Sequence, residues 1–407
     1  MKAMRVFRCI QCGSVAPHGI LDSFCSCGGF FDVDYDLSRV VLRDSDDPCI
    51  RYGDLLPLED PGQLVGPSHG PTRCLHLRTL GERWGLRHLY VKDETTLPTR
   101  TTKDRMGRLV VSVFKAHGVR DFTASSTGNS STALAHWVSW APEMSLHLFV
   151  GEAFLPYLQV SPEARNVHVW ALLGATFVEA AEEARRHAEA RGFMADRGFF
   201  NIARREGLKT AFLEAAEDLP EGIDWYVQAV SSAMGVYGAF KGAREMLALG
   251  RLEALPRLLC VQQASNAPMV RAFEEGHESF PSTHIVADPR GIARSILRGD
   301  PTRVYPHVRG IVTESGGTMA AVDEREILEA QQLLLELEGI TCCATAAVAL
   351  AGVGRLARMG QLEASAKILV NLTGRERPSG APERTQWLVR QGAAWVPEQA
   401  PPTGGQP

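Results

Sequence analysis

A lysine near residue 100 stands among side chains that suit covalent chemistry. Lys103 follows Thr101 and Thr102 and precedes Asp104 and Arg105, in a segment that leads from an expected strand into an expected helix. A lysine in such a place, beside hydroxyls and another cation, can have the pKa of its amine lowered and can form a Schiff base. Surface lysines greatly outnumber catalytic ones, so a solvated lysine is the alternative interpretation of this segment taken alone.

Two hydroxyl-rich segments follow other expected strands in the same way. Residues 125–131 read Ser-Ser-Thr-Gly-Asn-Ser-Ser; their hydroxyls and helix N-terminal amides would hold a carboxylate, and Asn129 could hydrogen-bond a ring hydroxyl. Residues 231–235 read Ser-Ser-Ala-Met-Gly, and their hydroxyls and successive amides form a cradle suited to a phosphate. Each of these two segments alone could equally be a plain helix cap. The three segments together indicate a ligand site.

Four of the nine cysteines lie within the first 27 residues. Cys9 and Cys12 form one close pair and Cys25 and Cys27 a second, which glycines follow directly. Because a reducing cytosol disfavours disulfides, this spacing predicts one tetrahedral metal site, a structural zinc ribbon that stabilises a segment too small to fold alone. Four ordinary free cysteines are the alternative. A nucleic-acid-binding ribbon is a weaker interpretation, because few Lys or Arg surround the cluster.

The composition excludes several classes of protein. The chain has 407 residues, of which 45% are hydrophobic and 22% charged, so it is long enough for two domains or for one large domain with an appendage. The 43 Lys and Arg against 47 Asp and Glu give a net charge of -4, which offers no basic surplus for nucleic acid or a membrane surface. Apolar runs are too short to span a bilayer, and residues 1–9 lack a signal-peptide core. We therefore expect a soluble, cytoplasmic protein.

Short apolar segments alternate with amphipathic ones from about Pro71 onward, with glycine or hydroxyl residues at the turns. Strands are expected at residues 88–91, 121–125, 146–150, 175–179, 225–230, 258–262 and 368–372. Helices are expected at residues 104–116, 130–140, 181–190, 236–249, 324–338 and 344–359. Such alternation predicts an α/β fold with mostly parallel sheets covered by helices, in which ligands bind where strands end and helices begin.

Further motifs recur along the chain in a known order. They are Lys92-Asp93-Glu94, Lys103-Asp104-Arg105, Ser126-Thr127-Gly128-Asn129, Glu206-Gly207-Leu208-Lys209-Thr210, Ala267-Pro268-Met269-Val270-Arg271-Ala272-Phe273, Glu314-Ser315-Gly316-Gly317 and Leu372-Thr373-Gly374. Together with the cysteine cluster they cover nearly the whole sequence. In this order the chain resembles the threonine synthases, which are pyridoxal-phosphate enzymes of fold type II with the tryptophan synthase β-like fold. Residues 201–207 and 226–230 are also similar to cysteate synthases.

The resemblance implies a two-lobed α/β enzyme with parallel sheets flanked by helices, preceded by a zinc-ribbon-like segment at residues 1–35. A large cofactor-binding domain would take residues 36–103 and 186–396, and a small substrate-binding domain residues 104–185. Residues 397–407, rich in Pro, Gly and Gln, are expected to form a disordered tail. Members of the family are commonly dimers, so we expect a homodimer that acts on a small amino acid substrate and has neither a nucleic-acid nor a membrane partner.

The resemblance also implies roles for individual residues. Lys103 would carry pyridoxal 5'-phosphate as a Schiff base, Asn129 would contact the cofactor 3′-oxygen, and Thr373 would contact the pyridine nitrogen. The cofactor phosphate would lie on Ser231, Ser232, Ala233, Met234 and Gly235. The substrate would be held by Ser126, Thr127, Gly128 and Ser130, and Arg100, which departs from the family pattern, is a further candidate contact to it. A neutral hydroxyl partner leaves the pyridine nitrogen largely unprotonated, which favours elimination over transamination.

The expected reaction is elimination or replacement on a phosphorylated hydroxy amino acid. Its leading form converts O-phosphohomoserine and water into threonine and phosphate, with the freed Lys103 amine removing the α-proton. A β-replacement synthase is the second interpretation, either a cysteate synthase that exchanges the phosphate of O-phosphoserine for sulfite or a synthase of specialised metabolism. A threonine or serine dehydratase ranks third. A non-catalytic zinc-ribbon binding protein is hard to reconcile with the presence of Lys103, Asn129 and Thr373 together.

The chain departs from the threonine synthase pattern beside the lysine. Arg100 stands where those proteins usually have glycine, and Thr102 where they have phenylalanine. Arg100 either faces an anionic substrate or nucleophile, or is a solvated loop arginine. In the phosphate segment, Ala233 and Met234 stand where relatives tend to carry glycine. These departures bear on the substrate rather than on the cofactor.

Overall fold

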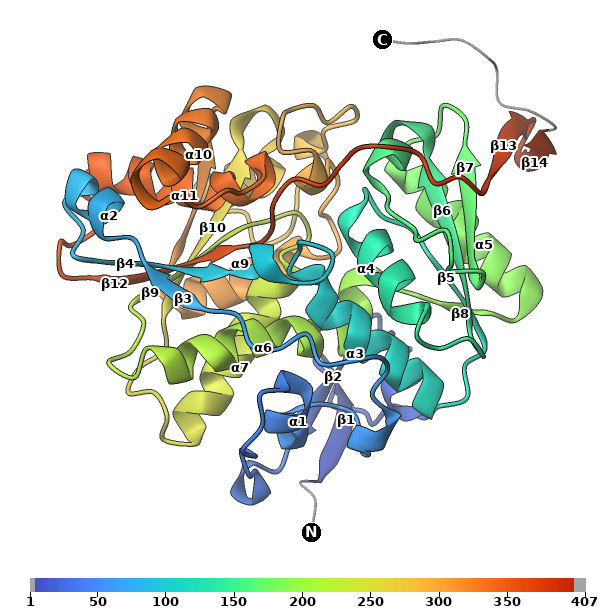
Figure 1. Ribbon diagram of the computed structural model, residues 1–407, viewed down its shortest axis with the longest axis horizontal. Coiled ribbons are helices and arrows are strands. Elements are labelled where there is room, and N and C mark those ends of the chain that lie inside the picture. Colours follow the sequence, from blue (N-terminus) through green and yellow to red (C-terminus); the bar gives the residue numbers. More distant parts are fainter. Residues whose placement is uncertain (1–3, 399–407) are drawn as a thin grey trace.

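Two six-stranded sheets and one two-stranded sheet form the computed structural model, which describes residues 4–398 (Figure 1). The first large sheet has the strand order β11-β10-β9-β12-β4-β3, and all its pairs are parallel except β3 with β4. Its strands are β3 (Cys74–His76), β4 (His88–Asp93), β9 (Trp225–Ala229), β10 (Arg257–Gln263), β11 (Thr318–Val322) and β12 (Lys367–Leu372). β12, which comes last in the sequence, therefore lies between β9 and β4.

The second large sheet has the strand order β14-β13-β7-β6-β5-β8 and is parallel except for the hairpin of β13 and β14. Its strands are β5 (Asp121–Ala124), β6 (Ser145–Gly151), β7 (Val167–Leu172), β8 (Met194–Ala195), β13 (Thr385–Gln391) and β14 (Ala394–Glu398). In Figure 1 this sheet stands on the right and the first sheet on the left, with α3 and α4 between them.

Helices cover both faces of the first sheet. Leu259 and Val261 of β10 pack with α10 and α11, whereas Leu258 and Cys260 pack on the opposite face with α7 and α9. Because both faces are buried, the middle of these strands is mostly apolar, as in parallel strands of α/β proteins generally. The helices are α1 (Pro48–Arg51), α2 (Arg78–Trp84), α3 (Lys103–Ala116), α4 (Asn129–Val138), α5 (Phe177–Arg191), α6 (Ile202–Asp218), α7 (Met234–Ala248), α8 (Pro268–Glu274), α9 (Tyr305–Glu314), α10 (Glu324–Glu338) and α11 (Ala344–Arg358).

The N-terminal segment forms the small antiparallel sheet of β1 (Arg5–Cys9) and β2 (Phe31–Tyr35), at the bottom of Figure 1. It is attached to α6 and α7 by buried polar contacts. Tyr35 donates to a carboxylate oxygen of Glu206 at 2.7 Å, and Lys241 Nζ lies 3.1 Å from Asp32 and 2.8 Å from Glu206. The segment is thus bonded to the same helices that border the candidate site described below.

One expected strand is wrong. Residues 175–179 do not form a strand; Thr176 and Glu179 form a reciprocal capping box, and α5 begins at Phe177. In a capping box the threonine side chain accepts the N3 amide while the glutamate returns to the cap amide, which stabilises a helix start. The strand that precedes α5 in the second sheet is β7, which ends at Leu172. The remaining expected strands and helices lie within a few residues of the observed ones.

The second sheet does not follow the expected domain limits, which assigned residues 104–185 to the small domain and residues 186–396 to the large one. β8 and the β13–β14 hairpin pair with the second sheet, so this sheet extends beyond the expected limits of 104–185. Pro397 and Glu398 of the expected tail belong to β14, and the rest of that tail lies outside the described residues. Among residues 4–398, no helix is both long and apolar enough to cross a membrane.

Candidate active site

A cavity lies where strands of the two large sheets end. The loops that follow β5, β9 and β12 line it, together with the start of α3 after β4. This edge is where α/β sheets bind ligands, because helix N-termini and exposed amides meet there. Of the predicted site residues, the cavity is lined by Lys103, Ser126, Thr127, Asn129, Ser130, Ser231, Ser232, Ala233, Met234, Gly235 and Thr373. The three strand-to-helix junctions that the sequence singles out therefore meet in one cavity.

Lys103 is the first residue of α3 and is partly buried at the cavity wall. The turn before it is fixed by the segment that follows β12: Thr102 N donates to Thr373 O at 2.9 Å, and Thr101 forms a bridge with Gly374. Burial, helped by the positive charge of Arg204, lowers the pKa of the Lys103 amine to about 8. The neutral amine, which is the nucleophilic form, is therefore accessible near neutral pH.

The loop after β9 has the shape of an anion cradle. Ala233 adopts a left-handed conformation with φ +55° and directly precedes α7, whose first residues are Met234 and Gly235. A Cβ atom at Gly235 would lie 2.5 Å from the Gln228 side-chain nitrogen, so any larger residue here would have to displace that side chain. The amides of a first helical turn have no partner within their own helix and point outward, which suits them to a phosphate.

The loop after β5 is held by its own hydroxyls. Ser126 Oγ accepts the amide of Ser131 at 2.9 Å and that of Gly128 at 3.2 Å. Gly128 has φ +123° and does not line the cavity, so its predicted contact with substrate is not supported. Ser125 Oγ, by contrast, lines the cavity, is buried and has no hydrogen-bond partner within the described part of the chain. The free polar groups of the loop therefore face the cavity.

Several residues that sequence reasoning missed belong to the site. Arg204, 3% exposed, lines the cavity from α6, and Arg377 donates to Asn129 Oδ1 at 2.5 Å from the segment after β12. Arg204 stands two residues before the motif that starts at Glu206, and Arg377 four residues after Thr373; these proximities were the only available signals. Arg100 lines an adjoining cavity rather than the one that contains Lys103.

Arg105, which the sequence places beside Lys103, faces away from the cavity. Its guanidinium is fully buried and donates to Glu94 at 2.6 Å and to Glu214 at 2.5 Å. Thr102 also donates to Glu94, at 2.9 Å. The Lys92-Asp93-Glu94 and Lys103-Asp104-Arg105 motifs therefore meet in a buried ionic cluster that holds the start of α3.

The four N-terminal cysteines converge on one point. Cys9 and Cys27 have sulfurs 3.5 Å apart, those of Cys12 and Cys25 are 3.6 Å apart, and all four lie within 4.8 Å of one another. Four thiolates at about 2.3 Å from a tetrahedral zinc ion would be separated by about 3.8 Å. The donor set and its spacing thus fit a structural zinc ion.

The comparisons with known proteins agree with this architecture. Residues 65–374 match the family model described as "Pyridoxal-phosphate dependent enzyme". The chain is 28% identical over 380 residues to a threonine synthase of Methanocaldococcus jannaschii, covering 90% of this chain and 91% of that protein. It is 30% identical over 372 residues to a cysteate synthase of Methanospirillum hungatei, covering 86% of this chain and 84% of that protein.

Solved structures show the same fold at low sequence identity. An L-serine ammonia-lyase from Rhizomucor miehei superposes with a TM-score of 0.61 at 16% identity, covering 77% of this chain and 95% of that one. Maize serine racemase superposes with a TM-score of 0.59 at 17% identity, covering 74% and 87%. The chain belongs to the family of pyridoxal-phosphate dependent enzymes, and its relatives mark it as a lyase or synthase of that family. The fold class expected from the sequence is thereby confirmed.

The residues of the cavity fit this cofactor. The amine of Lys103 is available for a Schiff base, the left-handed Ala233 and the close-packed Gly235 shape a phosphate cradle, and the unpartnered Ser125 hydroxyl faces the same space. Thr373 offers a hydroxyl from the end of β12. One cavity therefore offers this cofactor an amine, the amides of a helix start and several hydroxyls.

Proposed function

We propose that the protein converts a phosphorylated hydroxy amino acid by elimination, with O-phosphohomoserine and water giving threonine and phosphate. The observation that supports this proposal most directly is that one cavity is lined by Lys103, the 231–235 cradle, Asn129 and Thr373. The threonine synthases among the relatives support this choice of substrate. Zinc on the four cysteines and a homodimeric assembly complete the proposal as structural features.

In this proposal the residues of the cavity bind the substrate and transfer its protons. Bound pyridoxal phosphate supplies an electron sink that makes the substrate α-proton removable. Lys103 Nζ, with its lowered pKa, takes that proton and can return it to a neighbouring carbon, so that it acts as both base and acid. Ser126, Thr127 and Ser130 orient the substrate carboxylate at the N-terminus of α4.

Arg204 would hold negative charge next to the reacting groups. Its side chain is buried and ion-paired with Asp196, yet it lines the cavity and its charge acts on Lys103. A phosphate group that leaves beside a fixed guanidinium is stabilised without reorganisation of solvent. The arrangement therefore suits loss of an anionic leaving group.

The test measures phosphate release by the purified protein loaded with pyridoxal phosphate. O-Phosphohomoserine should give equal amounts of phosphate and threonine. Lys103→Ala should lose the cofactor absorbance that borohydride alters and should lower the turnover by about 10³-fold or more. Lys115→Ala, in the last turn of the same helix and half-exposed, is the matched control and should retain both. Wild-type-like turnover of Lys103→Ala would refute the assignment.

A replacement reaction is the second candidate, because several relatives are cysteate synthases at 25–30% identity. In that reaction O-phosphoserine would lose phosphate and gain sulfite at the same carbon. Phosphate release from O-phosphoserine that depends on sulfite, with none from O-phosphohomoserine, would favour this candidate over the first. Release from neither substrate would reject both.

A further inference from the structure

A second cavity adjoins the first and is lined by four arginines. The two cavities share Thr127, Asn129, Ser295 and Thr345 in their walls. The arginines are Arg100 before α3, Arg294 from the 292–298 segment, and Arg375 and Arg377 from the chain that follows β12. The four arginines of this arginine cavity therefore come from three separate parts of the sequence, and Asn129 lies in the wall that it shares with the first cavity.

The positive charge of the arginine cavity is not neutralised by the protein. Glu376 is the one acidic residue in its wall, and none of the four arginines forms an ion pair with a carboxylate of residues 4–398. Arg100 and Arg294 are exposed at the mouth of the cavity, whereas the Nε atoms of Arg375 and Arg377 are buried and lack a hydrogen-bond partner within the described residues. Buried donors that carry charge are costly to leave unpaired, so these two point to a ligand that accepts from them, and the exposed Arg100 and Arg294 add positive charge to the same cavity.

Backbone contacts hold these arginines in place. Arg100 has φ +57°, its carbonyl accepts the Arg375 amide at 3.1 Å, and its guanidinium donates to the carbonyl of Glu376 at 3.3 Å. Arg377 is anchored by Asn129 Oδ1 and by the Thr99 carbonyl, at 2.5 and 3.2 Å. The loop before Lys103 and the segment after Thr373 thus present their guanidinium groups together. Such preorganisation lowers the entropic cost of binding.

We propose that the arginine cavity binds a compact oxyanion that carries two negative charges, such as a phosphate or a sulfur oxyanion, in addition to the substrate carboxylate. Guanidinium groups bind such oxyanions through paired, charge-assisted hydrogen bonds. This inference deepens the proposed function, on which it rests, because it assigns the anionic reactant a place outside the Lys103 cavity. The oxyanion is either the phosphoryl group of the amino acid or a separate incoming nucleophile.

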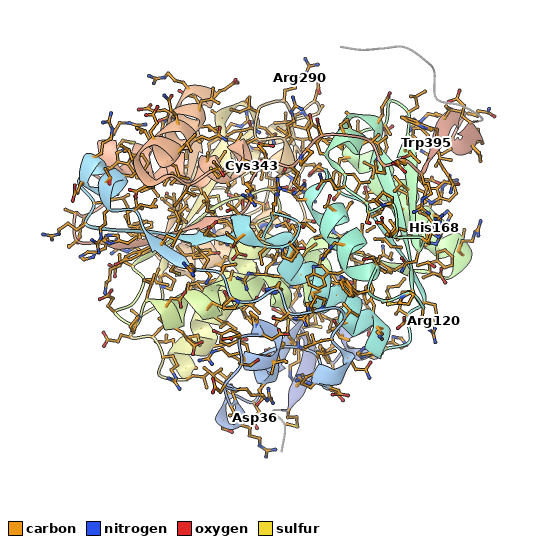
Figure 2. All side chains as sticks on the ribbon, viewed as in Figure 1. Asp36, Arg120, His168, Arg290, Cys343 and Trp395 are labelled. Carbon is orange, nitrogen blue, oxygen red and sulfur yellow. The ribbon has the colours of Figure 1, made fainter. Side chains whose placement is uncertain are left out.

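The test measures binding to the cofactor-loaded protein by calorimetry, with inorganic phosphate and sulfate as probes. Arg375→Gln and Arg294→Gln should each weaken binding about tenfold or more, since each removes charged donors. Arg290→Gln is the control: Arg290 lies on the outside of the molecule, paired with Asp288, and does not line the arginine cavity (Figure 2). It removes the same charge and should change the affinity less than about twofold.

Three results would overturn the proposal: no binding of phosphate or sulfate to the wild type at millimolar concentration, unchanged binding in both variants, or an equal loss in Arg290→Gln. If Arg375→Gln does not fold, Arg294→Gln decides, because it lies in a different segment. L-Homoserine and L-serine, which carry no phosphoryl group, should bind Arg294→Gln as well as wild type; an equal loss for them would instead assign the cavity to the α-carboxylate.

Kinetics of the variants distinguish the two sources of the oxyanion. A higher KM for the phosphorylated amino acid alone would place the leaving phosphoryl group in the arginine cavity, whereas a higher KM for sulfite alone would place the incoming nucleophile there. The binding measurement needs no turnover. Failure of the proposed function, seen as no phosphate release from either phosphorylated amino acid, is therefore distinguishable from failure of this inference.

Discussion

Lys103 acquires its reactivity from the side chains around it. Burial lowers the pKa of its amine from 10.5 to about 8, and Arg204 acts in the same direction. The lowered pKa means that the surroundings disfavour the cation. Half of the amine is therefore neutral at a pH more than two units below the pKa of a free lysine. Only this neutral form attacks the carbonyl of an incoming cofactor.

Uptake of the cofactor by the apoprotein should follow this ionisation. The rate of covalent attachment of pyridoxal phosphate, followed by absorbance, should rise with pH and level off above about 8. Arg204→Gln removes a like charge near Lys103, so its midpoint should move to higher pH. A wild-type rate that keeps rising up to pH 10 would contradict the shifted pKa.

Arg105 illustrates a residue whose role is structural. Burial opposes ionisation of its partner Glu214, yet Arg105 and Lys92 lower the pKa of that carboxyl to about 2. The ionised form therefore stabilises the fold above the ordinary pKa of 4.5, and this contribution is lost as the pH falls toward 2. The cluster also fixes Thr102 through Glu94 and so supports the turn that presents Lys103.

Arg105→Met should lower the free energy of unfolding by about 3–5 kcal/mol, because it leaves the buried carboxylate of Glu94 without its ion pair and that of Glu214 with Lys92 alone. Arg185, whose ion pairs with Glu182 and Glu189 lie on the exposed side of α5, is the matched control. Arg185→Met should cost no more than about 1 kcal/mol. Denaturant titration of both variants at neutral pH measures the difference. Equal losses of unfolding free energy would show that the buried cluster stabilises the fold no more than the exposed ion pairs do.

At the level of elements, the first turn of α7 is shaped by one close contact. Gly235 faces Gln228, whose side chain cannot easily move because Tyr226 donates to it at 2.9 Å and Asn371 at 3.2 Å. The contact joins the phosphate cradle to β9 and β12. The start of the cradle is therefore held by hydrogen bonds within the protein itself.

Gly235→Ala should push Gln228 away, lower the free energy of unfolding by about 1–3 kcal/mol and weaken retention of pyridoxal phosphate. Gly310 in α9 has open space around its Cα, so Gly310→Ala should instead raise the stability by up to about 1 kcal/mol. Thermal unfolding and dialysis of the cofactor from both variants test the pair. Equal behaviour of the two variants would show that the cradle tolerates a side chain.

The elements that sequence reasoning predicted are those with a clear period or a strong boundary. α10 lies at the bounds that its amphipathic segment predicts, and the structure shows that Asp323 and Glu326 form a capping box at its start. α6 was not expected, since it is buried on nearly all sides and shows no polar face, so its period of 3.6 is hidden. The short apolar segment at residues 175–179 predicts a strand, but Thr176 and Glu179 cap a helix there instead.

At the level of the whole molecule, the cysteine cluster is linked to the rest of the chain by charge. Asp32 at the end of the N-terminal segment faces Lys241 of α7 and Arg205 of α6. Phe24 also packs on Phe200, with ring centroids 4.8 Å apart. Order in the cysteine cluster therefore supports the first turn of α6, from which Arg204 reaches the cavity.

Removal of the metal should loosen this end of the molecule. Cys25→Ser should reduce bound zinc from about one ion per chain to a small fraction and should lower Tm by several degrees. Cys74→Ser lies outside the cluster and should keep the metal content of the wild type. Metal analysis by mass spectrometry with thermal unfolding measures both, and zinc bound equally by the two variants would rule out a four-cysteine site.

The part of the site that could be predicted from the sequence is the set of loops that directly follow strands. Lys103, Ser126 and the 231–235 segment could be located because each stands at a strand-to-helix junction, and these junctions meet in parallel sheets. Arg204, Arg294 and Arg377 could not, because an arginine in a helix or an irregular segment carries no local sign of the cavity it faces. Their positions depend on the tertiary packing of distant segments.

The central place of β12 has a consequence for synthesis of the protein. β4 leads to Lys103 and β9 leads to Ser231, but these strands are joined only through β12, which carries Thr373 at its end. Until residues 367–372 leave the ribosome, the nascent sheet has two open strand edges that can pair with other chains. The cofactor site is therefore completed late in translation, and a chain that stops short of β12 would be prone to aggregate rather than be partly active.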